Sequence, residues 1–412
     1  MKNSDPIIAI GSSRQPDSEK AAAEAAESVL AQFAHGKSVS WTLVFCGGRH
    51  DPQVVIRSLS SRLNTDCLIG GAAVGTITGD FLGSSGYELS IAAFSDVIPQ
   101  PAVISVDGLE NGEMEAGVTM GARLRETARE GDTVLLFYDS VRSSPPPVLH
   151  IGSYLMEGIY RGLQGKSLKL IGAGTAGDLQ LSGSYIFDGI EQKKHAVVAI
   201  VLPSFIESHT TIMHGCVPVS SFMEITKIDG SELYALDGRP ALDVLTEMLG
   251  NKQAPSVTDH LSLSLTIGEK HGDPFGPYDE SAYVNRLILA SNPENGSVIL
   301  FEADFHVGSR IQIMSRDNRL MLESVQKRTR QLWESIQDLD PFFAFYIDCA
   351  GRCNAFSGSE IEEAGLVQES VGKKIPLLGF YSGVEIAPCL GRSRPLDWTG
   401  VLTLFTRNKE LS

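Results

Sequence analysis

A short segment near the C-terminus concentrates residue types that could do chemistry. Asp348, Cys349 and Arg352 follow the apolar run FFAFYI (342–347), which predicts a strand. Ligands of α/β proteins gather at such strand ends. An arginine there could clasp a carboxylate with two hydrogen bonds, or it could lower the thiol pKa of the neighbouring cysteine. Three alternatives remain open: ligand contact, a structural Arg352–Asp348 ion pair, and thiol catalysis at Cys349.

A second candidate segment, GFYSGVEI (379–386), follows another apolar run. Its acid, Glu385, could bind an amine or accept backbone hydrogen bonds. An acid, an arginine and nearby aromatic side chains are the groups that a free amino acid would need. We therefore expect the ligand-binding residues to be Asp348, Cys349, Arg352, Gly379, Tyr381, Gly383 and Glu385.

Two glycine-rich motifs resemble nucleotide sites but lack the required context. Gly172–Gly177 fits G-x-G-x-x-G, yet the following DLQLSGS is poor for the helix that a dinucleotide site needs. Gly162–Ser167 resembles part of a P-loop, but the spacing requires glycine where Tyr160 stands. That segment also fits a helix end, which repels phosphate. Neither motif predicts a cofactor.

A metal site and two common hydrolase motifs are equally unsupported. His209, His214 and Cys216 lie close in sequence, but no fourth ligand is near for zinc. The chain contains neither G-x-S-x-G nor H-E-x-x-H. We expect no metal and no cofactor.

The elements that would position these residues recur three times. Each copy runs strand, helix, strand with a glycine turn, then strand, and the three glycine segments align without gaps. The aligned glycines are Gly70, Gly172 and Gly379, followed six residues on by Thr76, Asp178 and Glu385. The pattern predicts a duplicated architecture in which Gly172–Gly177 is a tight turn.

The middle of the chain differs from these copies. Pro218 to about Arg316 alternates apolar segments with turn-rich pieces, which indicates antiparallel strands and hairpins. A long helix fits about residues 318–337. We predict a mixed α/β or α+β fold with helices packed on mixed sheets, in two domains spanning 1–215 and 216–412.

Composition limits the class of protein. With 34 Lys plus Arg against 50 Asp plus Glu, the net charge of −16 disfavours binding to nucleic acid or anionic membranes. The start lacks the apolar core of a signal peptide, and no run approaches a membrane span. The six scattered cysteines fit reduced thiols. We expect a cytoplasmic, soluble protein.

Several segments resemble the FIST (F-box and intracellular signal transduction) family. GFYSGVEIAP (379–388) looks like the G-F-Y-(T/S)-x-G-E-I-x-P signature of the FIST C domain, and it departs at Val384, which stands before Glu385 where the signature has glycine. The loop 348–352 is similar to its cysteine–arginine loop. Residues 215–219 and 236–242 resemble the G-C-x-P and L-D-G-x-P-A-L stretches of the FIST N domain and the domain junction.

The resemblance implies a sensory role in signal transduction. FIST domains are proposed to bind small ligands, and their relatives are fused to kinases, cyclase-type enzymes or receptors. We expect a sensor of amino acids or related small carboxylates that signals through a partner such as a kinase or receptor. The alternative is an enzyme that uses Cys349, or the carboxylates of Asp348 and Glu385, in the same cleft.

Overall fold

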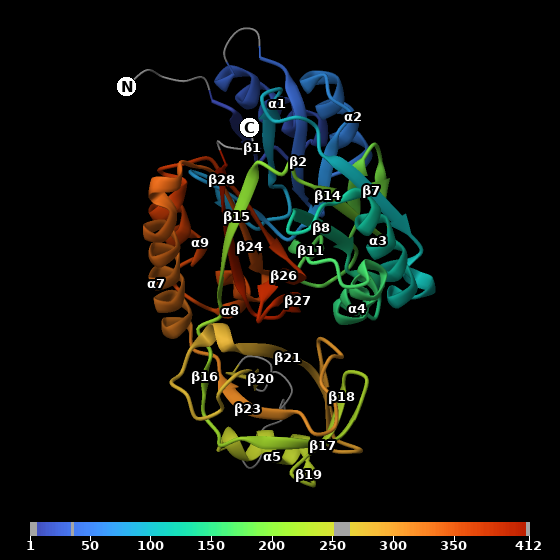
Figure 1. Cartoon of the computed structure of the whole chain (residues 1–412), viewed down its shortest axis with the longest axis vertical. Coiled ribbons are helices and arrows are strands. Elements are labelled where there is room, and N and C mark those ends of the chain that lie inside the picture. The colour runs from blue at the N-terminus through green and yellow to red at the C-terminus, as the bar shows by residue number, and fades with distance from the viewer. Residues whose placement is uncertain (1–5, 34–36, 251–263, 409–412) are drawn as a thin grey trace.

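The computed structural model describes residues 6–33, 37–250 and 264–408. Figure 1 shows a large body above a smaller lobe, with the long helix α7 along one side of the body. The body contains three copies of one unit, which runs strand, helix, strand, helix, strand, hairpin, strand. The predicted threefold repeat is therefore confirmed, and each copy is longer than the sequence indicated.

The three copies follow one another along the chain. The first comprises β1 (Ile8–Ser13), α1 (Ser18–Gln32), β2 (Val39–Gly47), α2 (Pro52–Leu63), β3 (Leu68–Ala73), β4 (Thr76–Thr78), β5 (Leu82–Gly83) and β6 (Leu89–Ser95). The second comprises β7 (Ala102–Asp107), α3 (Glu113–Thr127), β8 (Thr133–Asp139), β9 (Val141–Ser143), β10 (Val148–Leu149), α4 (Gly152–Leu163), β11 (Lys169–Thr175), β12 (Ile186–Gly189), β13 (Gln192–Lys193) and β14 (Ala196–Val201). The third comprises β15 (Ile206–Met213), α7 (Asn318–Ile336), β24 (Pro341–Cys349), α8 (Asn354–Ser357), α9 (Ala364–Val367), β25 (Leu377–Ser382), β26 (Val384–Cys389), β27 (Arg392–Leu396) and β28 (Gly400–Arg407).

The lobe is inserted into the third copy, between β15 and α7. Its elements are β16 (Val217–Pro218), β17 (Met223–Asp229), β18 (Glu232–Leu236), β19 (Arg239–Pro240), α5 (Ala241–Met248), β20 (Leu265–Lys270), β21 (Tyr283–Asn292), β22 (Ser297–Leu300) and β23 (Arg310–Ser315). The antiparallel pairing runs β23-β17-β18-β22-β21-β20 and returns from β20 to β23, so the strands close into a small barrel around their own apolar core. The predicted antiparallel character of this region is confirmed.

The hairpin of each copy pairs with a strand in the sheet of another copy. The three six-stranded sheets have the orders β1-β6-β2-β3-β12-β13, β7-β14-β8-β11-β26-β27 and β15-β28-β24-β25-β4-β5. The first sheet takes its hairpin from the second copy, the second from the third, and the third from the first. Strands from both halves of the chain are therefore hydrogen-bonded in two of the sheets.

The inner faces of the three sheets meet in one core. Phe45 stacks on Phe380 at 3.8 Å between ring centroids, and Phe137 meets Phe45 edge-on at 5.4 Å. The outer faces are covered by helices: α1 and α2 on the first sheet, α3 and α4 on the second, α7 and α9 on the third. Apolar burial on both faces of each sheet is the main stabilising contribution.

The aligned glycines are explained by close strand approach. A Cβ at Gly70, Gly172 or Gly379 would lie 2.1, 1.7 or 2.4 Å from a carbonyl oxygen of the neighbouring strand. The gap-free alignment is correct for Thr76 and Glu385, because each of them pairs with the residue that follows the aligned glycine of the neighbouring strand. It is wrong for the second copy, where Ile186 takes that position and Asp178 lies in a polar loop before it.

Candidate functional site

The predicted strand-end residues form a buried ion-pair cluster. Asp348, Cys349 and Arg352 stand at the end of β24, and the side chains of Asp348 and Arg352 have no exposed area. The guanidinium of Arg352 donates from Nε and Nη2 to Glu363, at 2.8 and 2.7 Å, and from Nη1 to the carbonyl oxygen of Trp398 at 2.9 Å. Its Nε also lies 3.2 Å from Asp348. The structural ion pair considered from the sequence exists, and Glu363 is a further partner that the sequence did not indicate.

Burial sets the protonation of this cluster. Burial, reinforced by the negative charge of Glu363, raises the pKa of Asp348 well above its ordinary value. Burial likewise raises the pKa of the Cys349 thiol, with Glu385 adding to the shift. A nucleophilic cysteine needs a lowered pKa and an accessible sulfur, so these conditions disfavour a thiol enzyme.

Of the remaining predicted residues, Gly379, Tyr381 and Glu385 are buried and Gly383 is half-buried. Glu385 accepts hydrogen bonds from Ser382 Oγ at 2.8 Å and Thr399 N at 3.3 Å, and burial raises its pKa. A Cβ at Gly383 would lie 2.9 Å from Ser140 Oγ, which gives this glycine a packing role.

Among the described contacts, Arg352 pairs with Asp348 but not with Glu385. Tyr381 is buried in the core beneath α9, and Gly379 lies in the closely packed strand β25. Ligand contact by the seven predicted residues stays a prediction.

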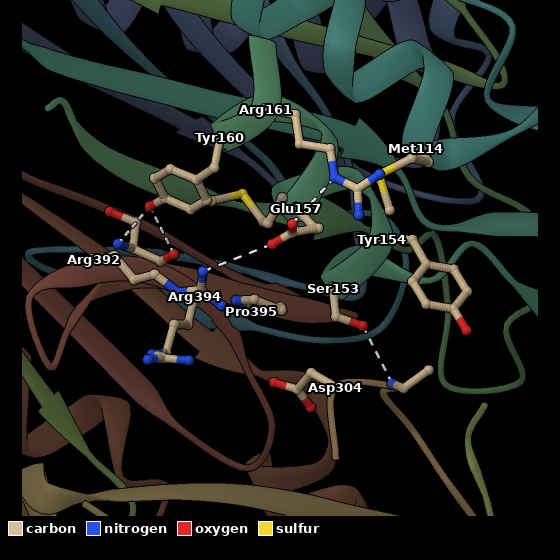
Figure 2. A pocket seen from close by; sticks show the side chains of 13 residues that line it. Met114, Ser153, Tyr154, Glu157, Tyr160, Arg161, Asp304, Arg392, Arg394 and Pro395 are labelled. Atoms are coloured by element: carbon tan, nitrogen blue, oxygen red, sulfur yellow. Dashed lines mark hydrogen bonds and ion pairs between the residues drawn. The ribbon is translucent and has the colours of Figure 1, made fainter. Parts of the chain in front are cut away.

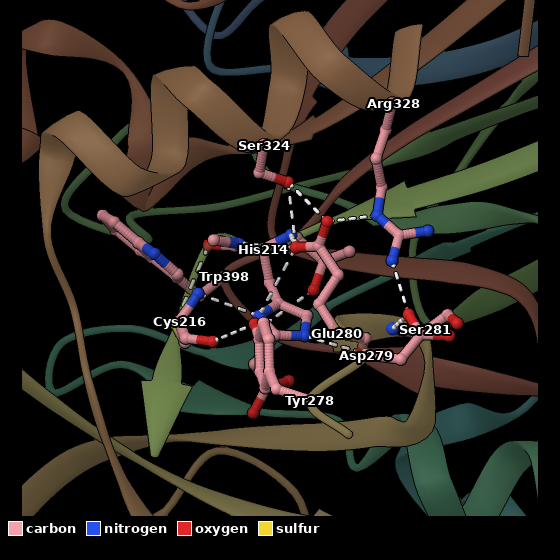
Figure 3. A network of polar contacts seen from close by, with 12 residues as sticks. His214, Cys216, Tyr278, Asp279, Glu280, Ser281, Ser324, Arg328 and Trp398 are labelled. Carbon is pink, nitrogen blue, oxygen red and sulfur yellow. Dashed lines mark hydrogen bonds and ion pairs between the residues drawn. The ribbon is translucent and has the colours of Figure 1, made fainter. Parts of the chain in front are cut away.

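The histidine–cysteine segment takes part in a second buried network, shown in Figure 3. The carboxylate of Glu280 accepts hydrogen bonds from the backbone N–H of His214 and Gly215, and from Ser324 and Arg328 on α7. The imidazole of His214 is used on both sides: Nε2 lies 2.8 Å from the carbonyl of Glu280, and Nδ1 accepts from Cys216 N at 3.0 Å. Glu280 of the barrel thus contacts both parts of the chain that connect the barrel to the body: the segment after β15 and the helix α7.

A cavity of about 300 Å³ lies where α4, β27 and the segment 303–304 of the barrel meet (Figure 2). None of the seven predicted residues lines it. Helix α4 is pinned to the edge strand β27 by Tyr160, whose hydroxyl donates to Ser393 O at 2.9 Å and accepts from Ser393 N at 2.7 Å. From the barrel side, Ala303 N donates to Ser153 Oγ at 3.2 Å.

Three arginines line the cavity, and their partners differ. Glu157 pairs with Arg161 at 3.2 Å and with Arg392 at 3.8 Å, as Figure 2 shows. The carboxylate of Asp304 is held by Arg286 through Nε at 2.7 Å and Nη2 at 2.5 Å. Arg394 makes no hydrogen bond or ion pair with any described residue, and its Nε is buried without a partner. Among the described residues, Arg394 is therefore the arginine of the cavity lining whose side chain has no ion-pair partner.

Unusual carboxyl groups lie directly behind the cavity. Glu302 is 1% exposed, and its Oε2 accepts from Ser153 N at the start of α4 at 2.7 Å, while Oε1 has no partner among the described residues. Burial and the nearby Asp397 raise the pKa of Glu302 to about 8. Burial raises the pKa of Asp397 to about 6, although Arg286 opposes the shift. Glu302 therefore keeps its proton in the folded chain at neutral pH.

The cavity residues were missed because no local motif marks them. More than half of the chain separates Ser153 from Arg394 in sequence. The two residues line the same cavity because β27 of the third copy belongs to the sheet of the second copy. The closest signal in the sequence is the pair of arginines flanking Ser393, in an otherwise acidic chain.

Family models match almost the whole body and barrel. The model of the FIST N domain matches residues 40–239, and that of the FIST C domain matches residues 241–388. The chain belongs to the FIST family. FIST domains are sensor domains of signal transduction, which agrees with the sensory role expected from the sequence.

Two relatives align over nearly the full length of the chain. An uncharacterized protein of Mycobacterium tuberculosis is 24% identical over 97% of this chain and 99% of its own length. An uncharacterized protein of Mycobacterium bovis is 23% identical over 98% of this chain and 100% of its own length. Among the described residues, no helix is both long and apolar enough to cross a membrane.

Proposed function

We propose that this FIST protein is a sensor that binds a small carboxylate, such as an amino acid, in the cavity between α4, β27 and the barrel. The observation that carries the proposal is Arg394, whose guanidinium lines the cavity without a described counter-ion. A planar guanidinium suits two-point recognition of a carboxylate. The volume of about 300 Å³ is at the lower end of the range for small-molecule sites.

The other cavity walls suit the remainder of an amino acid. Asp304 and Glu157 supply carboxylate oxygens for an ammonium group, although both already have arginine partners. Tyr154 and Tyr160 offer aromatic surface for a side chain. The cavity thus offers the same kinds of group, acid, arginine and aromatic, that the sequence suggested for a site near Glu385.

The position of the cavity supports a sensory use. Its walls come from the second copy through α4, the third copy through β27 and the barrel through Ala303 and Asp304. A ligand that contacts all three would favour the arrangement seen here, because a ligand shifts an equilibrium by its differential affinity for the two states. We propose that a signalling partner, such as a kinase or receptor, responds to this arrangement in the cytoplasm.

The test is a thermal-shift screen of the wild-type chain against amino acids and small carboxylates. A ligand at 100 times its Kd should add about 2.7 kcal/mol of stability. Arg394→Gln should lose the shift, whereas Arg161→Gln, which removes an arginine that already has a partner, should keep most of it. A shift that survives in Arg394→Gln but vanishes in a folded Arg352 variant would move the site to the strand end predicted from the sequence.

A further inference from the structure

A third polar cluster lies at the end of β8, apart from the cavity and from the Arg352 cluster. Glu113 begins α3, His150 precedes α4, and His195 precedes β14. Glu113 Oε1 is 2.8 Å from Nδ1 of His150, and Nε2 of His150 is 3.2 Å from Nδ1 of His195. The side chain of His150 is fully buried, whereas that of His195 is 32% exposed. The chain of hydrogen bonds therefore runs from the interior to the surface.

The carboxylate fixes the tautomers along this chain. Burial would raise the pKa of Glu113, but hydrogen bonds from His150 and from its own backbone, with the charges of His150 and Arg142, lower it below its ordinary value. An ionised Glu113 only accepts, so His150 donates from Nδ1, and in its neutral form His150 accepts at Nε2 from Nδ1 of His195. The lone pair of His195 then lies on Nε2, which has no hydrogen bond to any described residue and is not enclosed.

The backbone holds His195 in an uncommon conformation. Its φ of 49° lies in the left-handed region, which costs free energy for a residue other than glycine. Its N–H donates to Asp139 at 2.8 Å, and its carbonyl accepts from the N–H groups of Gly108 and Leu109 at 3.0 and 2.9 Å. Three backbone hydrogen bonds thus maintain a strained residue at a strand end, where its imidazole is aimed at His150.

We propose that His195 is a nucleophilic histidine that accepts a phosphoryl group at Nε2, with His150 and Glu113 as positioning residues that take up its Nδ1 proton. A base oriented by a second group is the arrangement that activates a nucleophile. The basic residues Lys193 and Lys194 precede His195, and Arg142 lies 3.9 Å from Glu113. Lys193 is paired with Asp188 and Asp107, and Arg142 with Glu113, so Lys194 is the exposed basic neighbour that has no ion pair to a described residue and can attract an anionic donor.

The reaction balances with a donor that contains a phosphorus–nitrogen bond, such as phosphoramidate. The Nε2 lone pair forms a bond to phosphorus, the phosphorus–nitrogen bond of the donor breaks, and its nitrogen, which is already protonated to –NH3+ in the zwitterionic donor, leaves with the bonding electron pair as neutral ammonia. The ring becomes cationic, and its Nδ1 proton moves towards His150 while the Nδ1 proton of His150 moves towards Glu113. The proposal does not depend on ligand binding at Arg394.

The experiment compares two histidines of the same chain. The full-length protein is incubated with phosphoramidate, and phosphorylation of each histidine is followed by mass spectrometry. His306 is the internal reference because it is exposed and its Nδ1 lies 3.2 Å from Ser309 Oγ instead of joining a carboxylate relay. We expect His195 to react at least roughly tenfold faster than His306.

The variants separate activation from simple exposure. His150→Gln should lower the rate at His195 towards that of His306 and change its pH profile, while the rate at His306 stays the same. Glu113→Gln, which keeps the shape of the side chain, is the second variant if His150→Gln fails to fold. Absence of phosphate on His195, equal rates at the two histidines, or an unchanged rate at His195 in a folded relay variant would overturn the proposal.

Discussion

At the scale of single residues, the arginines Arg352 and Arg394 differ in whether their side chains have partners within the described structure. Arg352 is enclosed, donates hydrogen bonds to Glu363 and Trp398, and forms an ion pair with Asp348, so in the described structure it holds the end of β24. Arg394 is partly buried beside a cavity and lacks a described partner. The same residue type thus has its donors satisfied at one position and lacks a described partner at the other.

Removing Arg352 should destabilise the protein strongly. Arg352→Ala leaves two buried acidic groups without their cation, which costs about 3–5 kcal/mol. The free energy of unfolding in urea measures the loss. Arg330→Ala is the matched control, because its ion pair with Glu334 is exposed at the surface and contributes about 1 kcal/mol or less. A loss of about 1 kcal/mol or less for both variants would contradict this assignment.

Glu302 should make stability depend on pH. In the folded chain its pKa is about 8, above the ordinary value of 4.5, so the folded state keeps a proton that the unfolded state releases between these values. The contribution of Glu302 to stability is therefore full at acidic pH and falls as pH rises from about 5 to about 8. Glu302→Gln cannot titrate and should flatten this part of the curve.

Urea unfolding at pH 5, 6.5 and 8 measures the difference between the two proteins. Asp397, Asp304 and Arg286 remain in both, so their own titration largely cancels. Parallel curves for the wild type and Glu302→Gln would show that Glu302 is ionised in the folded chain at neutral pH.

At the scale of elements, glycines decide how closely α3 and α4 pack. A Cβ at Gly158 would lie 2.2 Å from Met114 O, and one at Gly121 would lie 2.1 Å from Ile159 O. The segment 162–167, which resembles a P-loop in sequence, lies at the end of α4, as expected. These glycines serve helix packing, and this contact fixes the position of α4 beside the cavity.

Enlarging Gly158 should separate the two helices. Gly158→Ala forces the backbone apart and should cost about 1–3 kcal/mol. Gly365→Ala is the control, because nothing lies within 4 Å of its Cβ position and its φ is not in the left-handed region, so stability should stay the same or rise by up to about 1 kcal/mol. Equal effects of the two substitutions on the unfolding midpoint would contradict the packing argument.

Local elements were well predicted from the sequence, whereas the cavity was not. Helix α2 shows such a local signal, because Asp51 caps a proline-led first turn. The long helix predicted over about 318–337 is α7. The hairpin exchange and the pairing of Arg352 with Glu363 join segments by tertiary contact, which no local pattern encodes.

At the scale of the whole molecule, the FIST N and FIST C regions complete one another. The hairpin β4–β5 pairs with β25, and the hairpin β26–β27 pairs with β11, so each region fills a sheet edge of the other. The barrel is joined to the third copy by two connecting segments, both of which contact Glu280. It also contacts the second copy near Ser153. The division at 215/216 expected from the sequence stays a prediction, since the family models meet near residue 240.

A fragment of residues 1–239 should not fold cooperatively by itself. It exposes the edge of β11 and leaves β4–β5 without a sheet, and such unpaired edges promote aggregation. Near-ultraviolet circular dichroism during urea unfolding tests this expectation, with the full chain as control. A sharp, reversible transition of the soluble fragment would show that the FIST N region is independently stable.

The central claim is that Arg394 recognises a carboxylate in the cavity. Calorimetric titration of the best ligand from the screen and of its carboxamide analogue, into the wild type and Arg394→Gln, tests it most directly. We predict that the wild type prefers the carboxylate and that Arg394→Gln loses this preference, with a coupling energy of roughly 1.5–3 kcal/mol. An equal preference for the carboxylate in both proteins would contradict the account.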